Sequence, residues 1–344
     1  MDILIYGEMK IMIANRAIDL IGDTPLLKIG LNNNTWNVYL KLEKFNPGGS
    51  MKDRMALNMI EVAEKEGKLH PGGTIIESSS GNTAIGIAIA SIAKGYKFIA
   101  VVDHHTSEEK IKMIRALGGE IVVVGDEYKV NEVAVIEREK KAKELAEIME
   151  NAFFPNQADN FANRSAYIDT LANELCDELK IIDEFYAAIG TGGSICGTAI
   201  GLRKRNQNVR ITAIEPEGSI LFGGLGKPYF QSGTGNPINT PIPEIIDYSL
   251  INRNFYATDK EAFNTCRYFA KRFGLLIGGS AGGVLYKALE DLNQKHGSGT
   301  AVILLCDGGE RYLNTIFNDV WMLDNQLLDD QISINLKKWI KENM

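Results

Sequence analysis

Short apolar runs alternate with amphipathic patterns along most of this 344-residue chain, and this alternation constrains the fold more than any other feature. The runs have the length of strands, and the patterns between them have helical spacing. The expected strands are 38–42, 74–77, 97–102, 121–124, 152–155, 184–189, 209–215 and 300–306, and the expected helices are 53–66, 82–93, 107–117, 128–151, 164–179, 194–205, 260–273 and 280–295. This pattern predicts an α/β fold of parallel sheets covered by helices. Ligands of such folds bind beyond the carboxyl ends of the strands.

Charge and composition narrow the classes of protein further. With 37 basic and 44 acidic residues the net charge is −7, and no long basic run occurs, so nucleic acid is not an expected partner. No apolar run reaches membrane length, and residues 1–12 do not resemble a signal peptide. The cysteines lack metal-ligand spacing and indicate reduced thiols of a cytoplasmic protein: Cys176, Cys196, Cys266 and Cys306. The length favours one large or two medium domains.

The turn after the first expected strand carries a candidate reactive side chain. Asn-Pro-Gly-Gly at 46–49 breaks the strand, and Ser50 stands at the expected N-cap of the next helix. Lys52 then falls in the first helical turn, among unpaired backbone N–H groups at the positive end of the helix dipole. That field favours the neutral amine, which is the form that attacks aldehydes. Taken alone, the segment favours an ordinary exposed lysine.

Three later strand-to-helix turns have equally unusual compositions. Residues 77–83 offer hydroxyls, an amide and N–H groups at a helix start, which can clamp a carboxylate. Residues 190–194, Gly-Thr-Gly-Gly-Ser, suit a phosphate because glycines let the backbone approach the anion closely. Residues 278–283 contain Ser280 at the opening of a helix. Each turn alone is also typical of a simple tight connection.

Together the four turns indicate a phosphorylated aldehyde cofactor. Neither Gly-x-Gly-x-x-Gly after an N-terminal strand nor the Walker lysine pattern occurs, so the sequence does not indicate a dinucleotide or a nucleoside triphosphate. A phosphate cradle joined to an activated lysine points to pyridoxal 5′-phosphate.

Five segments resemble the fold type II pyridoxal-phosphate enzymes of the cysteine synthase and cystathionine β-synthase family, over residues 18–321. They are Asn-Pro-Gly-Gly-Ser-Met-Lys-Asp-Arg (46–54), Ser-Ser-Gly-Asn-Thr (79–83), Gly-Thr-Gly-Gly-Ser (190–194), Gly-Gly-Ser-Ala-Gly (278–282) and Gly-Glu-Arg-Tyr-Leu (309–313). The resemblance implies two parallel-sheet α/β domains with the cofactor in the cleft between them. The large domain would comprise 1–45 and 161–344. The small mobile substrate domain, 46–160, would carry the Schiff-base lysine.

The resemblance also implies roles for individual residues. Lys52 becomes the catalytic Schiff-base lysine, Asn82 lies near the ring hydroxyl, and Ser280 meets the pyridine nitrogen. The residues implied around the cofactor phosphate are Gly190, Thr191, Gly192, Gly193 and Ser194. The residues implied for the substrate carboxylate are Ser79, Ser80, Gly81, Thr83 and Gln157.

A neutral serine opposite the pyridine nitrogen has a chemical consequence. It leaves the ring unprotonated, which makes a weaker electron sink and suits β-elimination better than transamination. Lys52 would remove the α-proton, and a nucleophile would add to the resulting α-aminoacrylate. Closure of the small domain would keep water away from that intermediate.

Several departures from the family pattern bear on the substrates. Many relatives carry an aromatic residue after the glutamine, whereas Ala158 follows Gln157 here and should widen the pocket. Residues 218–223 and 311–321 look most like the diaminopropionate-pathway N-(2-amino-2-carboxyethyl)-L-glutamate synthases, although Gly190 stands where these often have a hydroxyl residue. Residues 278–282 and 216–219 look equally like cystathionine β-synthase, but there is no room for its C-terminal regulatory module.

Arg138 is a candidate for binding an anionic leaving group. It lies before Gln157 on the long expected helix, where diaminopropionate-type synthases also carry an arginine. A guanidinium can form a bidentate fork with the phosphate of O-phosphoserine. The alternative is a solvated helix charge, because Glu137 and Glu139 flank it, and this alternative is slightly favoured.

The predicted activity is β-replacement on an O-activated L-serine, O-acetyl- or O-phospho-L-serine, by a thiol or amine nucleophile in amino-acid biosynthesis. Cystathionine β-synthase, cysteine lyase and serine/threonine dehydratase activities stay open. A catalytically silent homologue that binds a partner is the alternative of another class, which the intact lysine and cofactor turns disfavour. We expect small amino-acid substrates, a cytoplasmic homodimer, and no nucleic-acid, membrane or metal partner.

Overall fold

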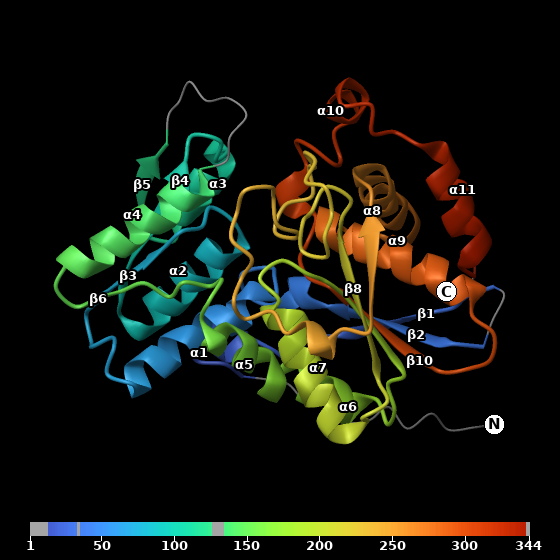
Figure 1. Cartoon of the computed structure of the whole chain (residues 1–344), viewed down its shortest axis with the longest axis horizontal. Coiled ribbons are helices and arrows are strands. Elements are labelled where there is room, and N and C mark those ends of the chain that lie inside the picture. The colour runs from blue at the N-terminus through green and yellow to red at the C-terminus, as the bar shows by residue number, and fades with distance from the viewer. Residues whose placement is uncertain (1–12, 33–34, 126–133, 342–344) are drawn as a thin grey trace.

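A computed structural model of the chain describes residues 13–32, 35–125 and 134–341 (Figure 1). The strands in these residues form two sheets with helices packed against them, which confirms the predicted α/β class. No helix within these three ranges is long and apolar enough to cross a membrane. The expectation for residues 1–12 lies outside the described residues, as does the part of helix 128–151 that covers 128–133.

The larger sheet has the strand order β1-β2-β10-β7-β8-β9. Its strands are β1 (Leu26–Ile29), β2 (Asn37–Leu42), β7 (Glu184–Ala188), β8 (Arg210–Pro216), β9 (Arg253–Ala257) and β10 (Thr300–Leu305). β1 pairs antiparallel with β2, and the other neighbours pair parallel. Because β10 lies between β2 and β7, segments from both halves of the chain build this sheet.

Helices on the larger sheet form two groups. The first is α7 (Gly193–Arg205), on which α5 (Phe161–Asp169) and α6 (Leu171–Glu178) pack. The second is α9 (Gly279–Gln294), with α8 (Asp259–Phe273) and α11 (Asp330–Trp339) against it. Figure 1 shows these groups on opposite sides of the sheet, with α10 (Asp319–Asp324) at its upper edge.

The smaller sheet has the order β5-β4-β3-β6, and all its strands are parallel. They are β3 (Thr74–Glu77), β4 (Lys97–Asp103), β5 (Glu120–Val124) and β6 (Ala152–Phe153). Helices α2 (Asn82–Lys94) and α3 (Glu108–Ala116) contribute to one hydrophobic core of this sheet. Helix α4 (Val135–Ile148) contributes to a second, separate hydrophobic core. These strands fall inside the small domain expected at 46–160, whose exact boundaries and movement stay predictions.

Helix α1 (Lys52–Lys65) joins the cores of the two sheets. Met55 and Met59 lie in the core of the larger sheet, whereas Ala56, Ile60 and Ala63 lie in that of the smaller one. Residues three or four apart share a face of a helix, so the two sets form adjacent stripes on α1. The first residue of α1 is therefore held by both cores.

Several elements differ from the sequence prediction. The strand β9 was not predicted because it is a partly exposed edge strand with polar residues, and the helices α10 and α11 were not predicted either. The helix expected at 164–179 is two helices, α5 and α6, separated by Thr170. Thr170 has φ −110° and ψ −84°, and its hydroxyl donates to the Ala166 carbonyl at 2.6 Å. A threonine that bonds the preceding turn competes with the helical hydrogen bonds and often bends a helix.

Arg54, one turn into α1, anchors this helix to the larger sheet. Its Nε and Nη2 donate to the two oxygens of Glu43 at 2.7 and 2.8 Å, and Nη2 also donates to Glu174 at 2.9 Å. Lys41 on β2 pairs with the same Glu174 at 2.7 Å. Burial raises the pKa of Glu174, but Arg54 and Lys41 outweigh it and lower the pKa to about 2. Because these charges are buried, removing one partner would leave another without compensation, which is strongly destabilising.

Arg54→Leu should lower the free energy of unfolding by about 3–5 kcal/mol, because it leaves Glu43 buried without its cation. Arg205→Leu is the matched control, since Arg205 is exposed and lies 3.7 Å from Asp177. We expect that control to stay within about 0.5 kcal/mol of the native value. Denaturant titrations followed by circular dichroism measure both. Equal effects would contradict the anchoring role of Arg54.

Candidate active site

Two of the four turns meet at the segment that follows β10. The Met51 N–H donates to the Cys306 carbonyl at 2.9 Å, and the Gly308 N–H donates to the Gly49 carbonyl at 3.2 Å. From the fourth turn, the Gly278 N–H donates to the carbonyl of Asp307 at 3.2 Å. This is the carboxyl end of a central strand, where parallel sheets place their ligands.

The second turn reaches the same segment through Asn82, the first residue of α2. Its Nδ2 donates to Asp307 Oδ2 at 2.9 Å, and its Oδ1 accepts from Arg311. The Tyr312 hydroxyl donates to the same Asp307 oxygen at 2.7 Å. The sequence analysis gave no role to Asp307, Arg311 or Tyr312. The available signal was their position directly after the strand expected at 300–306.

Lys52 opens α1 within this arrangement. The structure places Met51 at the N-cap, not Ser50, whose Oγ instead accepts from the Lys52 backbone N–H at 3.2 Å. Lys52 is half-buried, so its interpretation as an ordinary exposed lysine is wrong. Burial lowers the pKa of its amine, while Cys306 and Asp307 act in the opposite direction. The predicted direction is correct, but its main cause is desolvation rather than the helix dipole.

The structure brings together residues predicted to clamp a carboxylate. Thr83 Oγ1 donates to Gln157 Oε1 at 2.7 Å. Glu77, at the end of β3, accepts from the Ser78 N–H at 2.8 Å and from the Gln157 N–H at 3.3 Å. Burial raises the pKa of Glu77 to about 8. The turn between Glu77 and α2 contains the other residues predicted for the clamp: Ser79, Ser80 and Gly81.

The third turn packs closely against neighbouring segments at the start of α7. Gly192 is the N-cap, with φ +84°, and a Cβ added there would lie 2.6 Å from Ile246. A Cβ on Gly193 would lie 2.1 Å from Asn163 Oδ1. Both positions therefore require glycine, and the N–H groups of the helix start suit a phosphate. The turn also contains the other residues predicted for this site: Gly190, Thr191 and Ser194.

Asn163 connects this turn to the carboxylate clamp. Its Nδ2 donates to the Gln157 carbonyl at 2.7 Å and to Thr191 Oγ1 at 3.2 Å. The sequence analysis missed Asn163, because only the packing of α5 against α7 reveals its position.

Ser280 is buried in the first turn of α9. Its Oγ lies 2.9 Å from Cys306 Sγ. Burial, reinforced by Asp307, raises the pKa of the Cys306 thiol, which therefore stays neutral. Ser280 and Lys52 thus share Cys306 as a neighbour.

Arg138 is not a solvated helix charge, so the alternative favoured in the sequence analysis is wrong. Its Nη1 lies 3.2 Å from Asp103 Oδ2 at the end of β4, and the two side chains are 14% and 5% exposed. Within the described part of the chain, Arg138 Nε and Asp103 Oδ2 are buried without a hydrogen-bond partner. Contact of Arg138 with a substrate stays a prediction.

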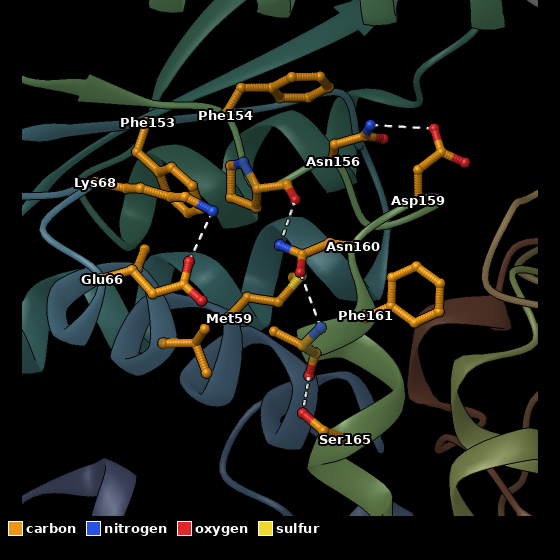
Figure 2. Close-up of a pocket in the computed structure, with 14 residues that line it drawn as sticks. Met59, Glu66, Lys68, Phe153, Phe154, Asn156, Asp159, Asn160, Phe161 and Ser165 are labelled. Carbon is orange, nitrogen blue, oxygen red and sulfur yellow. Dashed lines mark hydrogen bonds and ion pairs between the residues drawn. The ribbon is translucent and has the colours of Figure 1, made fainter.

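A cavity of about 680 Å³ lies beside the second half of α1 (Figure 2), and Lys52 does not line it. Met59 of α1 and Glu66, which directly follows α1, line it on one side, and Phe153 of β6 and Phe161 of α5 also line it. The residues predicted for the active site do not line this cavity. This cavity is therefore separate from the candidate site at the turns around β10.

Comparison with known proteins identifies the class. A family model described as pyridoxal-phosphate dependent enzyme matches residues 17–307. A putative cysteine synthase of Sinorhizobium fredii is 47% identical over 332 residues, which cover 96% of this chain and 98% of the relative. This chain is therefore a member of the pyridoxal-phosphate-dependent enzymes, with fold type II and pyridoxal 5′-phosphate as cofactor.

Solved structures resemble this chain over most of its length. A hydrogen sulfide-producing enzyme of Fusobacterium nucleatum has a TM-score of 0.82 and 37% identity, covering 88% of this chain and 99% of that one. An O-acetylserine-dependent cystathionine β-synthase of Helicobacter pylori has a TM-score of 0.80 and 36% identity, covering 89% and 99%. Within its class, the enzyme belongs to the cysteine synthase family.

The raised pKa of Glu77 predicts a pH dependence of stability. Between its usual pKa of 4.5 and about 8, the folded chain keeps a proton that the unfolded chain releases. This contribution is full below about 4.5 and is lost as the pH rises to about 8. Glu77→Gln cannot ionise, so its unfolding free energy should rise relative to the native value as the pH increases from about 5 to 8.

Denaturant titrations at several pH values in that range test this prediction. Glu147→Gln, on the exposed side of α4, is the matched control. A constant difference between Glu77→Gln and the native enzyme would contradict the titration assigned to Glu77.

Proposed function

We propose that this enzyme replaces the β-substituent of an O-activated L-serine by a thiol or sulfide, with O-acetyl-L-serine as its preferred donor. The observation that carries the proposal is the convergence of Lys52, Asn82 and Ser280 on the segment after β10. Burial desolvates the Lys52 amine, and the neutral hydroxyl of Ser280 contacts Cys306, which also acts on Lys52. The cysteine synthase relatives support the same reaction class.

The residues fit pyridoxal 5′-phosphate. The backbone N–H groups at the start of α7, where Gly192 is the N-cap, suit its phosphate, and the lowered pKa of Lys52 suits attachment to its aldehyde. Ser280 is the partner proposed for its pyridine nitrogen, and Asn82 the partner for its ring hydroxyl. When bound, the cofactor supplies the electron sink that makes the α-proton acidic.

The chain would then perform the following tasks. The clamp around Thr83 and Gln157 holds the carboxylate of the donor and sets the position of its α-carbon. Lys52 Nζ accepts the α-proton, and the β-substituent leaves with its bonding electrons. The acceptor then forms a bond to the β-carbon, and Lys52 Nζ returns the proton. We propose that the smaller sheet moves to exclude water during these steps.

The charges near the donor site favour a donor whose β-substituent is an uncharged ester over one that carries a phosphate dianion. Residues 79–83 contain no cation, and Arg138 is already offset by Asp103. A phosphate dianion would have to compete with Asp103 for the guanidinium. The Helicobacter pylori structure is named for dependence on O-acetylserine. O-Acetyl-L-serine is therefore the donor that we propose, and O-phospho-L-serine is the competing one.

The size and chemical class of the acceptor are proposed from the residues beside Gln157 and from the relatives. We propose that the small side chain of Ala158, next to Gln157, allows an acceptor larger than sulfide. Sulfide, homocysteine and glutamate cover the thiol and amine classes. Turnover of O-acetyl-L-serine with each of them tests the proposal, and exclusive use of glutamate would overturn the thiol assignment.

Lys52→Ala should abolish turnover while the fold is retained, because Lys52 is the group that carries the cofactor and moves the proton. Borohydride reduction of the native enzyme should fix the cofactor on the peptide that contains Lys52, as measured by mass spectrometry. Lys65→Ala, at the exposed end of the same helix, is the control and should keep its activity. Turnover by Lys52→Ala would contradict the assignment.

Asp103→Asn should shift donor choice towards O-phospho-L-serine by about tenfold relative to O-acetyl-L-serine. The variant keeps the shape of the side chain but frees Arg138 for a charge-assisted bond worth roughly 1.5–3 kcal/mol. The ratio of kcat/KM for the two donors measures the effect. In the double variant with Arg138→Gln the shift should disappear. An unchanged ratio in Asp103→Asn would remove Arg138 from the donor site.

A further inference from the structure

The Cys306 thiol lies against the hydroxyl of Ser280, and both side chains are buried. Their Sγ and Oγ atoms are 2.9 Å apart, and the two residues are 7% and 5% exposed. Cys306 directly follows β10, and its carbonyl accepts from the Met51 N–H at 2.9 Å, next to Lys52. The same residue therefore connects the segment that opens α1 with the segment that opens α9.

Neither side chain has another partner at an equally short distance. Among the residues that the structure describes, Ser280 Oγ makes one hydrogen-bonding contact, with Cys306 Sγ. The thiol also faces Asp307 Oδ1, but at 3.7 Å. Burial and the neighbouring Asp307 raise the pKa of the thiol, which therefore keeps its hydrogen. The contact thus joins two groups that each carry one hydrogen.

The number of hydrogens decides what Ser280 can do. A hydroxyl donates one hydrogen and accepts through two lone pairs, and a thiol can donate or accept. The pyridine nitrogen, unprotonated opposite a neutral serine, offers a lone pair and no hydrogen. If the serine hydrogen went to the sulfur, none would remain for that nitrogen. Ser280 can serve both neighbours only when the thiol hydrogen lies in the contact between Ser280 and Cys306.

We propose that Cys306 is a positioning residue: its S–H donates to Ser280 Oγ and leaves the serine hydrogen for the pyridine nitrogen of the cofactor. The inference rests on the proposed function, in which Ser280 is the partner of that nitrogen. Hydrogen bonds in a chain polarise one another, so a hydroxyl that accepts from the thiol donates more strongly. Cys306 thereby acts on the cofactor through Ser280.

Infrared spectroscopy of the holoenzyme tests the direction of this hydrogen bond. The S–H stretching band falls in a region free of other protein bands, and it moves to lower frequency when the thiol donates. Subtracting the spectrum of Cys306→Ser assigns the band of Cys306. In Ser280→Ala that band should move to higher frequency, because its acceptor is gone. A band that stays in place or moves to lower frequency would overturn the proposal.

Cofactor affinity measures the consequence of the contact. In Cys306→Ala, the dissociation constant of pyridoxal 5′-phosphate should rise about three- to tenfold, the effect of losing one net hydrogen bond. Cys306→Ser keeps a donor at this position and should stay within about twofold of the native value. Cys266→Ala is the matched control and should also stay native, because this buried thiol lies against the Gly278 carbonyl at 3.3 Å. Equilibrium dialysis of the full-length chain measures these constants.

A double variant separates a positioning role from loss of packing. If Cys306 acts through Ser280, Cys306→Ala should alter cofactor affinity by less than about twofold in the Ser280→Ala background. The same loss in both backgrounds would overturn the positioning role, because removal of the thiol would then act through packing alone. Native affinity in Cys306→Ala would overturn it as well.

The outcomes also separate this inference from the proposed function. The infrared comparison leaves no cavity at Cys306, so it decides the proposal even if Cys306→Ala does not fold. If the band of Cys306 did not respond to Ser280→Ala, borohydride labelling of Lys52 would still support the function. Absence of cofactor on Lys52 would overturn the function and, with it, the role of Cys306.

Discussion

The position of α1 is the constraint on which the rest of this structure depends. Its two apolar stripes belong to different cores, and a buried arginine, Arg54, ties its first turns to the larger sheet. A helix held in this way has little freedom to slide or rotate, since interiors are close-packed. Lys52, as its first residue, is positioned mainly by the contacts of Arg54 and Met55 with the larger sheet. The position of the amine proposed to carry the cofactor therefore follows from the packing of the helix.

That environment is organised by the chain after β10. The turns before α1 and α7 follow strands of the larger sheet, the turn before α2 follows a strand of the smaller sheet, and the turn before α9 follows α8, so no single sheet brings the four together. The segment 306–312 instead connects three of them, by backbone hydrogen bonds to Gly49 and Gly278 and by the carboxylate of Asp307. A buried carboxylate with two donors on one oxygen is costly to leave unsatisfied. Its satisfaction therefore requires Asn82 and Tyr312 to lie in their observed places.

The sequence predicted the elements and the turns better than it predicted the connections between them. Strand–helix alternation gives the α/β class because periodicity is local, and the glycines at 190–194 signal close backbone approach in the same local way. Arg54, Asn163 and Asp307 act across distances of tens to hundreds of residues, and no pattern in a short window marks a buried polar residue with such partners. The burial of Lys52 was also inaccessible, because it comes from packing and not from the helix start.

Asn163 connects the turn before α7 to the segment that contains Gln157. Its amide donates to the Gln157 carbonyl and to the Thr191 hydroxyl, while its oxygen lies against Gly193. One side chain thereby sets the distance between the proposed carboxylate clamp and the proposed phosphate cradle. In that arrangement the carboxylate clamp would position the α-carbon of any amino-acid donor, whatever its β-substituent is. Selection of the leaving group and of the acceptor would then depend on other residues, such as Ala158 and the Asp103–Arg138 pair.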